Sequence, residues 1–490
     1  MSGHSLKSRT AGTLKWNAID RVASQLLYAL TGVVLARILS PQDFGLVGAV
    51  LVFQAFASLL VDSGFYSALL QRKEPTQTDY STILWFNLAM AAGLYVILYV
   101  CAPLIADCFG GDRRIIPLSR VMFLGFIINA TSIVQVNRLM KRMDVRMVAV
   151  ADTLGLVLGG VAGIALAMGG YGAWAIVWQA LTAGAVKSLV LWTTQGWRPS
   201  RTFSWTSLRS FSAIGSRMMA TAFLNTIFLN IYSFLIGNRT GLVPLGYYTQ
   251  ADKWSKVGIL SLYQVVTSSF LPPLAAVQDD CGRFRRMCGR MGRFTAYLTF
   301  PALTGMAVMA TPLFHMLFGT KWDASIILFQ ILVVRGIFTV FTGLYTQYLL
   351  ALGQARAIMW LEVVRDAAAI VALVITFPYL VAGGDVATDG VEIMLWGQLL
   401  ASALAWVVTL FVTARGTGIG VIALLLDMAP YAALCGVAAP LMLLCVGLSV
   451  HPALQLAAMT LLGGGIYVGV NAVLGSRVQR DAIGYLLRRR

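Results

Sequence analysis

The chain has 490 residues, of which 58% are hydrophobic and only 12% are charged, and its mean hydropathy is +0.77. Soluble domains carry about 25% charged residues, so this composition excludes a soluble protein and predicts a polytopic membrane protein. The net charge of +17 does not indicate nucleic acid as a partner, because most basic residues lie in short loops between apolar runs and no basic face carries interleaved aromatic residues.

Apolar runs long enough to cross a bilayer recur along the whole chain. A transmembrane helix needs about 20 predominantly apolar residues. We therefore expect an all-α membrane protein with about 14 transmembrane helices, of which the seventh, eighth and eleventh are the least apolar. The predicted spans are residues 14–38, 44–68, 82–106, 115–137, 147–168, 171–193, 211–236, 244–272, 294–318, 325–350, 357–380, 391–413, 421–448 and 453–474.

The distribution of Lys and Arg between these spans predicts their orientation. With the N-terminus in the cytoplasm, 24 basic residues fall in cytoplasmic segments and only four fall in outside loops. The four are Arg113, Arg114, Arg239 and Lys321. Basic residues accumulate on the cytoplasmic side of membrane proteins. A multi-pass protein with both termini in the cytoplasm is therefore predicted.

Two similar stretches about 200 residues apart suggest an internal duplication. Residues 35–48 read LARILSPQDFGLVG and residues 235–248 read LIGNRTGLVPLGYY, each with a small residue nine positions before a glycine. The alternative is that any two turns between apolar helices look alike. If the duplication is real, the expected parts are an N-lobe at 1–195, a cytoplasmic linker at 196–209, a C-lobe at 210–415, spans 13 and 14 at 416–475, and a basic cytoplasmic tail at 476–490.

Two local patterns have simple structural interpretations. Glycines in span 5 (Gly155, Gly159 and Gly163) and in span 14 (Gly463 to Gly465 and Gly469) are expected to let neighbouring helices approach closely. The linker carries Trp197, Phe203 and Trp205, which suit a segment at the membrane interface.

Ionisable residues deep inside predicted spans mark the candidate site. A charged side chain at the bilayer centre costs at least about 2.5–3.5 kcal/mol, so it normally faces a partner or a wet cavity. Either these residues are structural ion pairs, or the excess of cations forms a basic cavity for an anionic group. The candidate substrate-binding cations are Arg21, Arg217, Lys253, Lys256, Arg335 and Arg365. Five other charged residues, Arg37, Arg120, Asp152, Lys187 and Asp427, lie near span ends, where snorkelling explains them.

Spacing within the helices gives finer expectations. Asp252 and Lys256 are four residues apart and can pair on one helix face, which leaves Lys253 turned away from that pair. Glu362 and Asp366 share a face with Arg365 beside them.

Motifs for energy conversion or catalysis are not found. There is no GxxxxGK[ST] sequence and no HExxH sequence, and the three histidines are scattered. We therefore expect no cofactor, no metal site and no enzymatic activity. An ion gradient, the membrane potential or a substrate gradient would have to supply any energy that the protein uses.

Four motifs carry a resemblance to a known family. They are SLKSRTAGTLKW near the N-terminus, LARILSPQDFGLVG, DSGF at 62–65 and GYYTQADKW at 246–254. The chain resembles the polysaccharide transporter family of the multidrug/oligosaccharidyl-lipid/polysaccharide (MOP) flippase superfamily, in particular lipopolysaccharide and exopolysaccharide biosynthesis flippases of the colanic-acid-exporter type. The resemblance implies a MATE-like fold with two six-helix lobes in parallel pseudo-twofold repeat plus two C-terminal helices, and rocking alternating access.

The resemblance also implies a substrate and partners. The substrate would be an undecaprenyl-diphosphate-linked oligosaccharide repeat unit, moved from the inner to the outer leaflet of the bacterial cytoplasmic (inner) membrane for polysaccharide export. A glycan polymerase and co-polymerase are possible partners besides the lipid bilayer. Related lipid flippases carry cavity arginines on spans 1, 2 and 8; here span 1 offers Arg21 and span 8 offers Lys253 and Lys256, whereas span 2 offers only Asp62. Spans 13 and 14 would line a groove for the lipid tail.

The resemblance gives the candidate residues their roles. The cations would neutralise the diphosphate. Tyr247, Tyr248 and Trp254 are candidates for stacking on sugar rings, with interfacial anchoring as the alternative for the two tyrosines. Candidates for ion coupling are Asp252, Glu362, Asp366 and Asp62.

Two other functions remain open from the sequence. A MATE-like ion-coupled antiporter of drugs or organic cations would use Glu362 and Asp366 to bind the cation, but the excess of buried cations argues against it. A membrane glycan enzyme would need a sizeable outside loop or a positioned His/Asp pair, and neither is seen.

Overall fold

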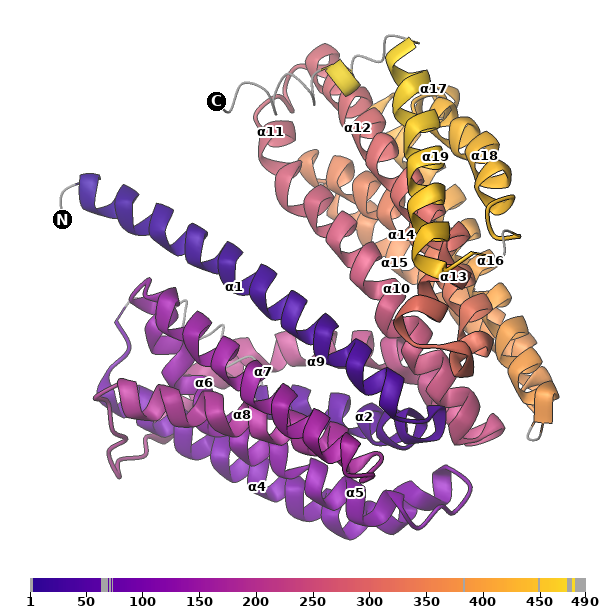
Figure 1. The fold of residues 1–490 in the computed structure, drawn as a ribbon. Coiled ribbons are helices and arrows are strands. Elements are labelled where there is room, and N and C mark those ends of the chain that lie inside the picture. Colours follow the sequence, from indigo (N-terminus) through magenta and orange to yellow (C-terminus); the bar gives the residue numbers. More distant parts are fainter. Residues whose placement is uncertain are drawn as a thin grey trace. The chain divides into compact units, whose positions relative to one another are not determined.

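A computed structural model describes residues 3–62, 69, 72, 74–381, 384–447, 450–473 and 478–480. The side chains of residues 3–15, 17–19, 62, 210, 212–221, 224–225 and 384–387 are outside this description. All regular structure in the described ranges is helical (Figure 1). The chain divides into two compact units, Met1–Gly246 and Tyr247–Arg490.

The first unit is built from long helices joined by short turns. They are α1 (Gly3–Ile38), α2 (Pro41–Asp62), α4 (Gln77–Cys108), α5 (Ile115–Met122), α6 (Leu124–Lys141), α7 (Val145–Met168), α8 (Trp174–Thr194) and α9 (Trp205–Thr240). Within this unit α7 packs against both α1 and α8, α4 packs against α6, and α2 packs against α9.

The second unit follows from α10 (Leu242–Ser269), whose first turn still belongs to the first unit. Its other elements are α11 (Leu271–Ala275), α12 (Cys281–Val308), α13 (Ala310–Leu317), η1 (Thr320–Trp322), α14 (Asp323–Ala351), α15 (Ala355–Thr376), η2 (Phe377–Tyr379), α16 (Gly384–Thr417), α17 (Val421–Leu426), α18 (Ala429–Leu443) and α19 (Pro452–Val473). Within this unit α16 packs against α14 and α15, and α12 packs against α14 and α18.

Every predicted span overlaps at least one of these helices. Ten helices of the described residues are long and apolar enough to cross a membrane, and the α12–α13 pair makes an eleventh if it is one span. That pair is bent by 63° at its break, Met309. The helices of the eleventh and thirteenth predicted spans are not in this set, because α15 carries several charged residues and α18 has only 15 residues. For the seventh span, many side chains of α9 lie outside the described residues. The all-helical membrane architecture is confirmed, and the full count of 14 stays a prediction.

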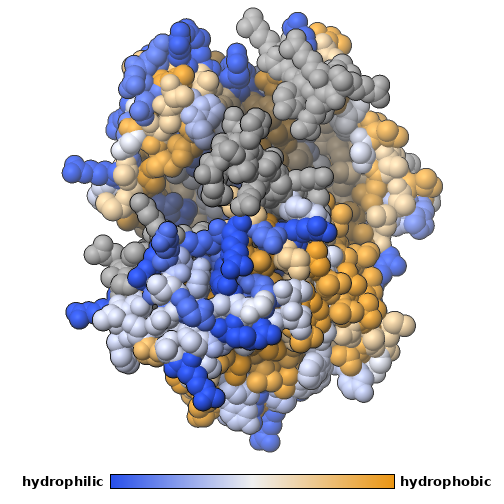
Figure 2. Space-filling view, turned by 90° about the vertical axis from the view of Figure 1, so that its left-hand side faces the viewer, coloured by the Kyte–Doolittle hydropathy of each residue, from blue (hydrophilic) through white to orange (hydrophobic). Residues whose placement is uncertain are grey.

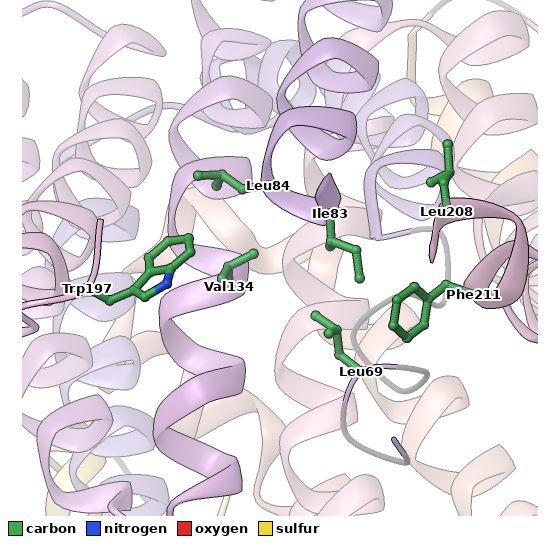
Figure 3. Close-up of a cluster of buried hydrophobic side chains, with 7 residues drawn as sticks. All are labelled: Leu69, Ile83, Leu84, Val134, Trp197, Leu208 and Phe211. Carbon is green, nitrogen blue, oxygen red and sulfur yellow. The ribbon is translucent and has the colours of Figure 1, made fainter. Parts of the chain in front are cut away.

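The contacts assign α9 to the first unit, where it packs on α2 and α4. The predicted linker at 196–209 therefore lies inside the first unit, whereas the predicted N-lobe and C-lobe would be separated at these residues. A hydrophobic cluster holds it in place: Leu69, Ile83, Leu84, Val134, Trp197, Leu208 and Phe211 (Figure 3). Trp197 is therefore a core residue and not an interfacial one, and its indole N–H donates to Gln77 Oε1 at 2.5 Å. Trp205 remains 75% exposed, as expected for an interfacial anchor.

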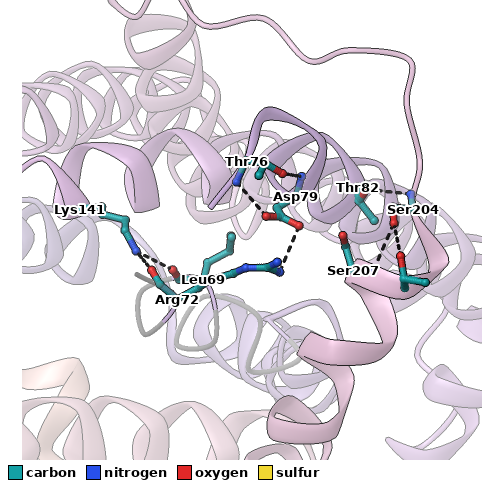
Figure 4. A network of polar contacts seen from close by, with 9 residues as sticks. Leu69, Arg72, Thr76, Asp79, Thr82, Lys141, Ser204 and Ser207 are labelled. Atoms are coloured by element: carbon teal, nitrogen blue, oxygen red, sulfur yellow. Dashed lines mark hydrogen bonds and ion pairs between the residues drawn. The ribbon is translucent and has the colours of Figure 1, made fainter. Parts of the chain in front are cut away.

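Polar contacts fix the same linker and the start of α4 (Figure 4). Thr76 and Asp79 form a capping box at the start of α4, in which Thr76 N donates to Asp79 Oδ2 at 2.8 Å. Arg72 pairs with Asp79 at 3.2 Å. The backbone N–H of Ser204 donates to Thr82 Oγ1 at 3.0 Å and thereby ties the start of α9 to α4.

Small residues pack α7 against α8 as the sequence predicts. A Cβ added to Gly155 or Gly159 would contact the backbone oxygen of Ala183 or Gln179, respectively, at 2.6 Å. In α19 only Gly463 has such a contact, with Met442, whereas Gly464, Gly465 and Gly469 face open space. The packing prediction is therefore confirmed for α7 and wrong for three of the four glycines in α19.

The surface is apolar over large areas. Figure 2 shows extensive hydrophobic surface on one face, with hydrophilic side chains gathered in patches. Large side chains such as Leu461 and Val473 are 76% and 87% exposed. Such exposure in water would be unfavourable, and it suits helices that face lipid.

An ion pair ties the C-terminal helices to the rest of the second unit. Arg293 Nη1 of α12 lies 2.6 Å from Asp427 Oδ1, between α17 and α18. This partner replaces the snorkelling interpretation of Asp427.

Replacing Arg293 by glutamine is expected to lower the apparent Tm of the purified protein by roughly 2 °C, because a partly exposed pair contributes up to about 1 kcal/mol. Arg286→Gln removes an arginine from the same helix that forms no ion pair with a described residue, so its Tm should not change. Equal Tm values for the two variants would contradict a stabilising role for the pair.

Candidate functional site

The two similar sequence stretches meet in the structure. The first forms the turn between α1 and α2, where Ser40 N and Oγ donate to Asp43 Oδ2 at 2.9 and 2.7 Å and Pro41 begins α2. The second joins α9 to α10 through the single residue Gly241, whose φ of 92° favours glycine.

A reciprocal close contact of glycines joins these stretches. A Cβ on Gly45 would collide with the carbonyl oxygen of Leu242, and a Cβ on Gly246 would collide with that of Pro41. The contact is reciprocal, because Leu242 lies four residues before Gly246 and Pro41 lies four residues before Gly45. These four residues all belong to the first unit. We call this contact the glycine crossing. It brings the N-terminal turns of α2 and α10 as close as backbones allow.

A polar cavity of about 280 Å³ lies inside the first unit, between α2, α6 and α8. It is lined by Ser58, Val61, Phe126, Asn129, Ser132, Ile133, Val136 and Lys187. Lys187 Nζ lies 2.6 Å from Asp152 Oδ1 of α7, and Asp20 of α1 interacts electrostatically with both groups. The cavity therefore contains a charged pair at its wall.

The Asp152–Lys187 pair is not among the contacts expected from the sequence. The expectation that both residues are snorkelling side chains near span ends is wrong, because the two side chains pair across α7 and α8. A signal was available: the residues lie at similar distances from the turn at Gly169–Gly172, so an antiparallel hairpin places them at the same depth.

On α10 the predicted local pair is present. Lys256 Nζ donates to Asp252 Oδ2 at 2.6 Å. Lys253 is half-buried on another side of the helix, with its ammonium group 5.7 Å from the ring centroid of Trp254. The positive charge of Lys256 is therefore compensated by the carboxylate of Asp252, one helical turn away.

On α14 and α15 the two predicted arginines have different surroundings. Arg335 is half-buried, its Nε is buried without a hydrogen-bond partner, and it forms no ion pair with a described residue. Arg365 pairs with Glu362 and donates to Asp366 Oδ1 from Nε and Nη2 at 3.2 and 3.1 Å. Arg365 therefore belongs to a cluster whose formal charge is −1.

The remaining candidates lie apart from these groups or outside the described part. Arg21 is exposed on α1. The side chains of Arg217 and Asp62 lie outside the described residues, although their backbones belong to α9 and α2.

The three aromatic candidates on α10 have packing partners. Tyr248 is 3% exposed, Tyr247 packs edge-on against Trp322 at 6.1 Å, and Trp254 packs against Phe318 at 5.3 Å. These contacts give all three rings a structural role, and sugar stacking stays a prediction.

An apolar groove of about 360 Å³ runs between α12, α18 and α19. Its walls include Pro301, Gly305, Ala438, Ala439 and Gly463. Small residues on both sides leave room for a long flexible apolar chain, and the groove carries no charged side chain among its lining residues. The described residues contain no group of three or more His, Cys, Asp or Glu that could hold a metal ion.

Long apolar helices, apolar exposed faces and charged groups held inside helical units define a multi-pass membrane protein. The sequence matches the polysaccharide biosynthesis protein family over residues 34–327, which is more than half of the chain. The chain belongs to this family, and the resemblance found in its motifs is confirmed.

Named relatives agree with this assignment. The chain is 27% identical to the succinoglycan biosynthesis transport protein ExoT of Rhizobium meliloti (strain 1021), over 78% of this chain and 75% of that protein. It is 26% identical to the lipopolysaccharide biosynthesis protein WzxC of Escherichia coli (strain K12), over 68% of each. The protein is accordingly a bacterial inner-membrane transport protein and not an enzyme.

Solved structures share the fold. The lipid II flippase MurJ in its inward closed conformation matches with a TM-score of 0.72 at 13% identity, over 95% of this chain and 99% of that chain. An inward-facing MATE family transporter of the MOP superfamily matches with a TM-score of 0.59 at 17% identity, over 81% of this chain and 96% of that chain.

Proposed function

We propose that this protein is a flippase that moves an undecaprenyl-diphosphate-linked oligosaccharide repeat unit from the inner to the outer leaflet of the cytoplasmic membrane. The observation that carries the proposal is the apolar groove of α12, α18 and α19, in a member of a polysaccharide biosynthesis family. A prenyl tail needs an apolar path beside the protein while its headgroup crosses, and α18 and α19 provide one wall of such a path.

The headgroup requires positive charge. A diphosphate buried without partners would be prohibitively costly, so cations must accompany it across the membrane. Arg335 fits this role best, because it forms no ion pair with a described residue, whereas Lys256 and Arg365 already have carboxylate partners. Lys253, half-buried on α10, is also part of the proposed set. Arg21 and Arg217 complete the proposed set, and Asp252, Glu362, Asp366 and Asp62 remain the proposed coupling residues.

Alternating access needs a contact that closes one side and can separate. The glycine crossing fits the outer closure, because the predicted topology places both turns at the outer surface and the contact depends on two residues without side chains.

Deleting the gene tests the proposal. Lipid-linked single repeat units are expected to accumulate on the cytoplasmic leaflet, and the surface polysaccharide should be lost. Normal surface polysaccharide without such accumulation would contradict the proposal, as long as no second flippase of the same specificity is expressed.

The groove gives a separate prediction. Ala439→Phe, which fills the groove, is expected to lower the transport rate of the undecaprenyl-linked substrate about tenfold in reconstituted vesicles, but not that of an analogue with a short prenyl chain. Ala433→Phe, on an exposed face of the same helix, is the control and should leave both rates unchanged. Equal losses with both lipids would contradict tail binding in the groove.

A drug antiporter is the second candidate function. It is favoured by the shared MATE fold and by the excess negative charge around Arg365. The MATE transporter, however, covers 81% of this chain against 95% for the lipid flippase, so the flippase fold accounts for more of the helices. Drug resistance upon overexpression, with unchanged surface glycan, would support the antiporter.

A further inference from the structure

A second polar cavity, of about 210 Å³, lies inside the second unit between α10, α14, α15 and α16. We propose that it binds one neutral sugar ring of the transported oligosaccharide. This inference rests on the proposed flippase function and assigns a part of the substrate to one place in the fold. The cavity is smaller than the roughly 300–1,000 Å³ typical of sites for drug-sized ligands, which suits a single ring.

Hydroxyl groups dominate the polar wall of this cavity. Neither Tyr263 Oη nor Thr342 Oγ1 makes a hydrogen bond with a described residue, although both side chains line the cavity. Thr346 and Ser402 donate to carbonyls of their own helices and keep oxygen lone pairs that can accept. The wall thus offers donors and acceptors together, which a sugar with several hydroxyl groups can satisfy.

The aromatic rings of the cavity are held in place by packing. Gly343 of α14 faces the Tyr263 ring so closely that a Cβ there would collide with it. On the same helix Phe338 packs against Trp406 of α16 with ring centroids 5.6 Å apart. Rings fixed in this way give an apolar surface for the C–H face of a sugar without a large loss of side-chain entropy.

The charges at the edge favour a neutral ligand over a diphosphate. Arg365 is held by Glu362 and Asp366, so this cluster has a formal charge of −1 and repels phosphate groups. An arginine–carboxylate pair presents charged donors and acceptors to hydroxyl groups, which gives strong hydrogen bonds.

A metal ion fits the cavity less well than a sugar. The carboxylate of Glu362 is already engaged by the guanidinium group, and no cluster of three acidic, His or Cys side chains occurs in the described part of the chain. A hard cation would require several more oxygen ligands around one point.

Binding to the purified protein tests the inference with two probes, the host's undecaprenyl-diphosphate-linked repeat unit and undecaprenyl diphosphate without sugar. The double substitution Tyr263→Phe and Thr342→Val removes the two unbonded hydroxyl groups and keeps the side-chain volumes. We expect it to weaken binding of the sugar-bearing lipid about tenfold and to change binding of the sugar-free lipid by less than twofold. Thr409→Val is the control, because Thr409 is buried, donates to Ala405 of its own helix and does not line the cavity.

Unchanged binding of the sugar-bearing lipid to the double variant, or equal weakening with both lipids, would overturn the inference. A dependence of both affinities on Na⁺ that the double variant abolishes would also overturn it in favour of a cation site. Transport by the wild-type protein separates these failures from a failure of the proposed function. If the wild type moves the lipid-linked repeat unit, the flippase proposal stands whatever the double variant does; if it moves none, the proposed function itself is wrong.

Discussion

Replacing Gly45 by valine is expected to reduce transport of the lipid-linked substrate by at least about 100-fold. A side chain at this position meets the backbone carbonyl of Leu242, and backbone cannot move aside as a flexible side chain can. Overpacking of this kind costs about 3 kcal/mol or more, which would shift the population away from the closed outer side by roughly two orders of magnitude. The measurement is the initial transport rate in reconstituted vesicles. Gly246→Val should behave alike because its contact is reciprocal.

Gly93→Val is the matched control for this prediction. Gly93 lies within α4 and has no neighbouring atom within 4 Å of an added Cβ, so valine there adds the same volume without a collision. Its transport rate should stay near that of the wild type. Full activity of the Gly45→Val variant would show that α2 and α10 need not approach this closely during transport.

The second large effect is expected from two half-buried cations of the second unit, Arg335 and Lys253. Arg335→Gln and Lys253→Gln are each expected to lower transport about ten- to a hundredfold, because an uncompensated diphosphate inside the membrane costs several kcal/mol. Transport by vesicles with each variant, at equal protein content, checks the prediction.

The control for these variants must remove a positive charge elsewhere. Arg415→Gln does so at the exposed end of α16 and should leave transport unchanged. Lys253→Gln combined with Lys256→Gln removes both candidate cations of α10. If that double variant keeps full activity, α10 does not contribute to diphosphate binding.

Much of the fold could be predicted from the sequence because membrane spans depend on local composition. A run of about 20 apolar residues has few alternatives to a helix across the bilayer. Short turns were also predictable from local sequence, as at Ser40 to Asp43, where the two capping residues are only three positions apart.

The site was harder to predict because its contacts join distant parts of the chain. The motif around Gly45 was recognised, but its contact with Leu242 depends on how two helices cross. Asp152 and Lys187 each looked like an isolated charge until α7 and α8 were placed side by side. Arg365 shows the opposite case: its two carboxylate partners are within four residues, so its neutralisation could be expected from spacing alone.

The most direct test of the central proposal is translocation by the purified protein. Vesicles containing only this protein and the undecaprenyl-diphosphate-linked repeat unit, loaded in one leaflet, are probed with a membrane-impermeant reagent that labels or cleaves the sugar. The flippase proposal predicts that the protein transfers the substrate to the other leaflet faster than protein-free vesicles do and that Gly45→Val abolishes the difference. Equal transfer rates with and without the wild-type protein, under every imposed ion gradient and membrane potential, would contradict it.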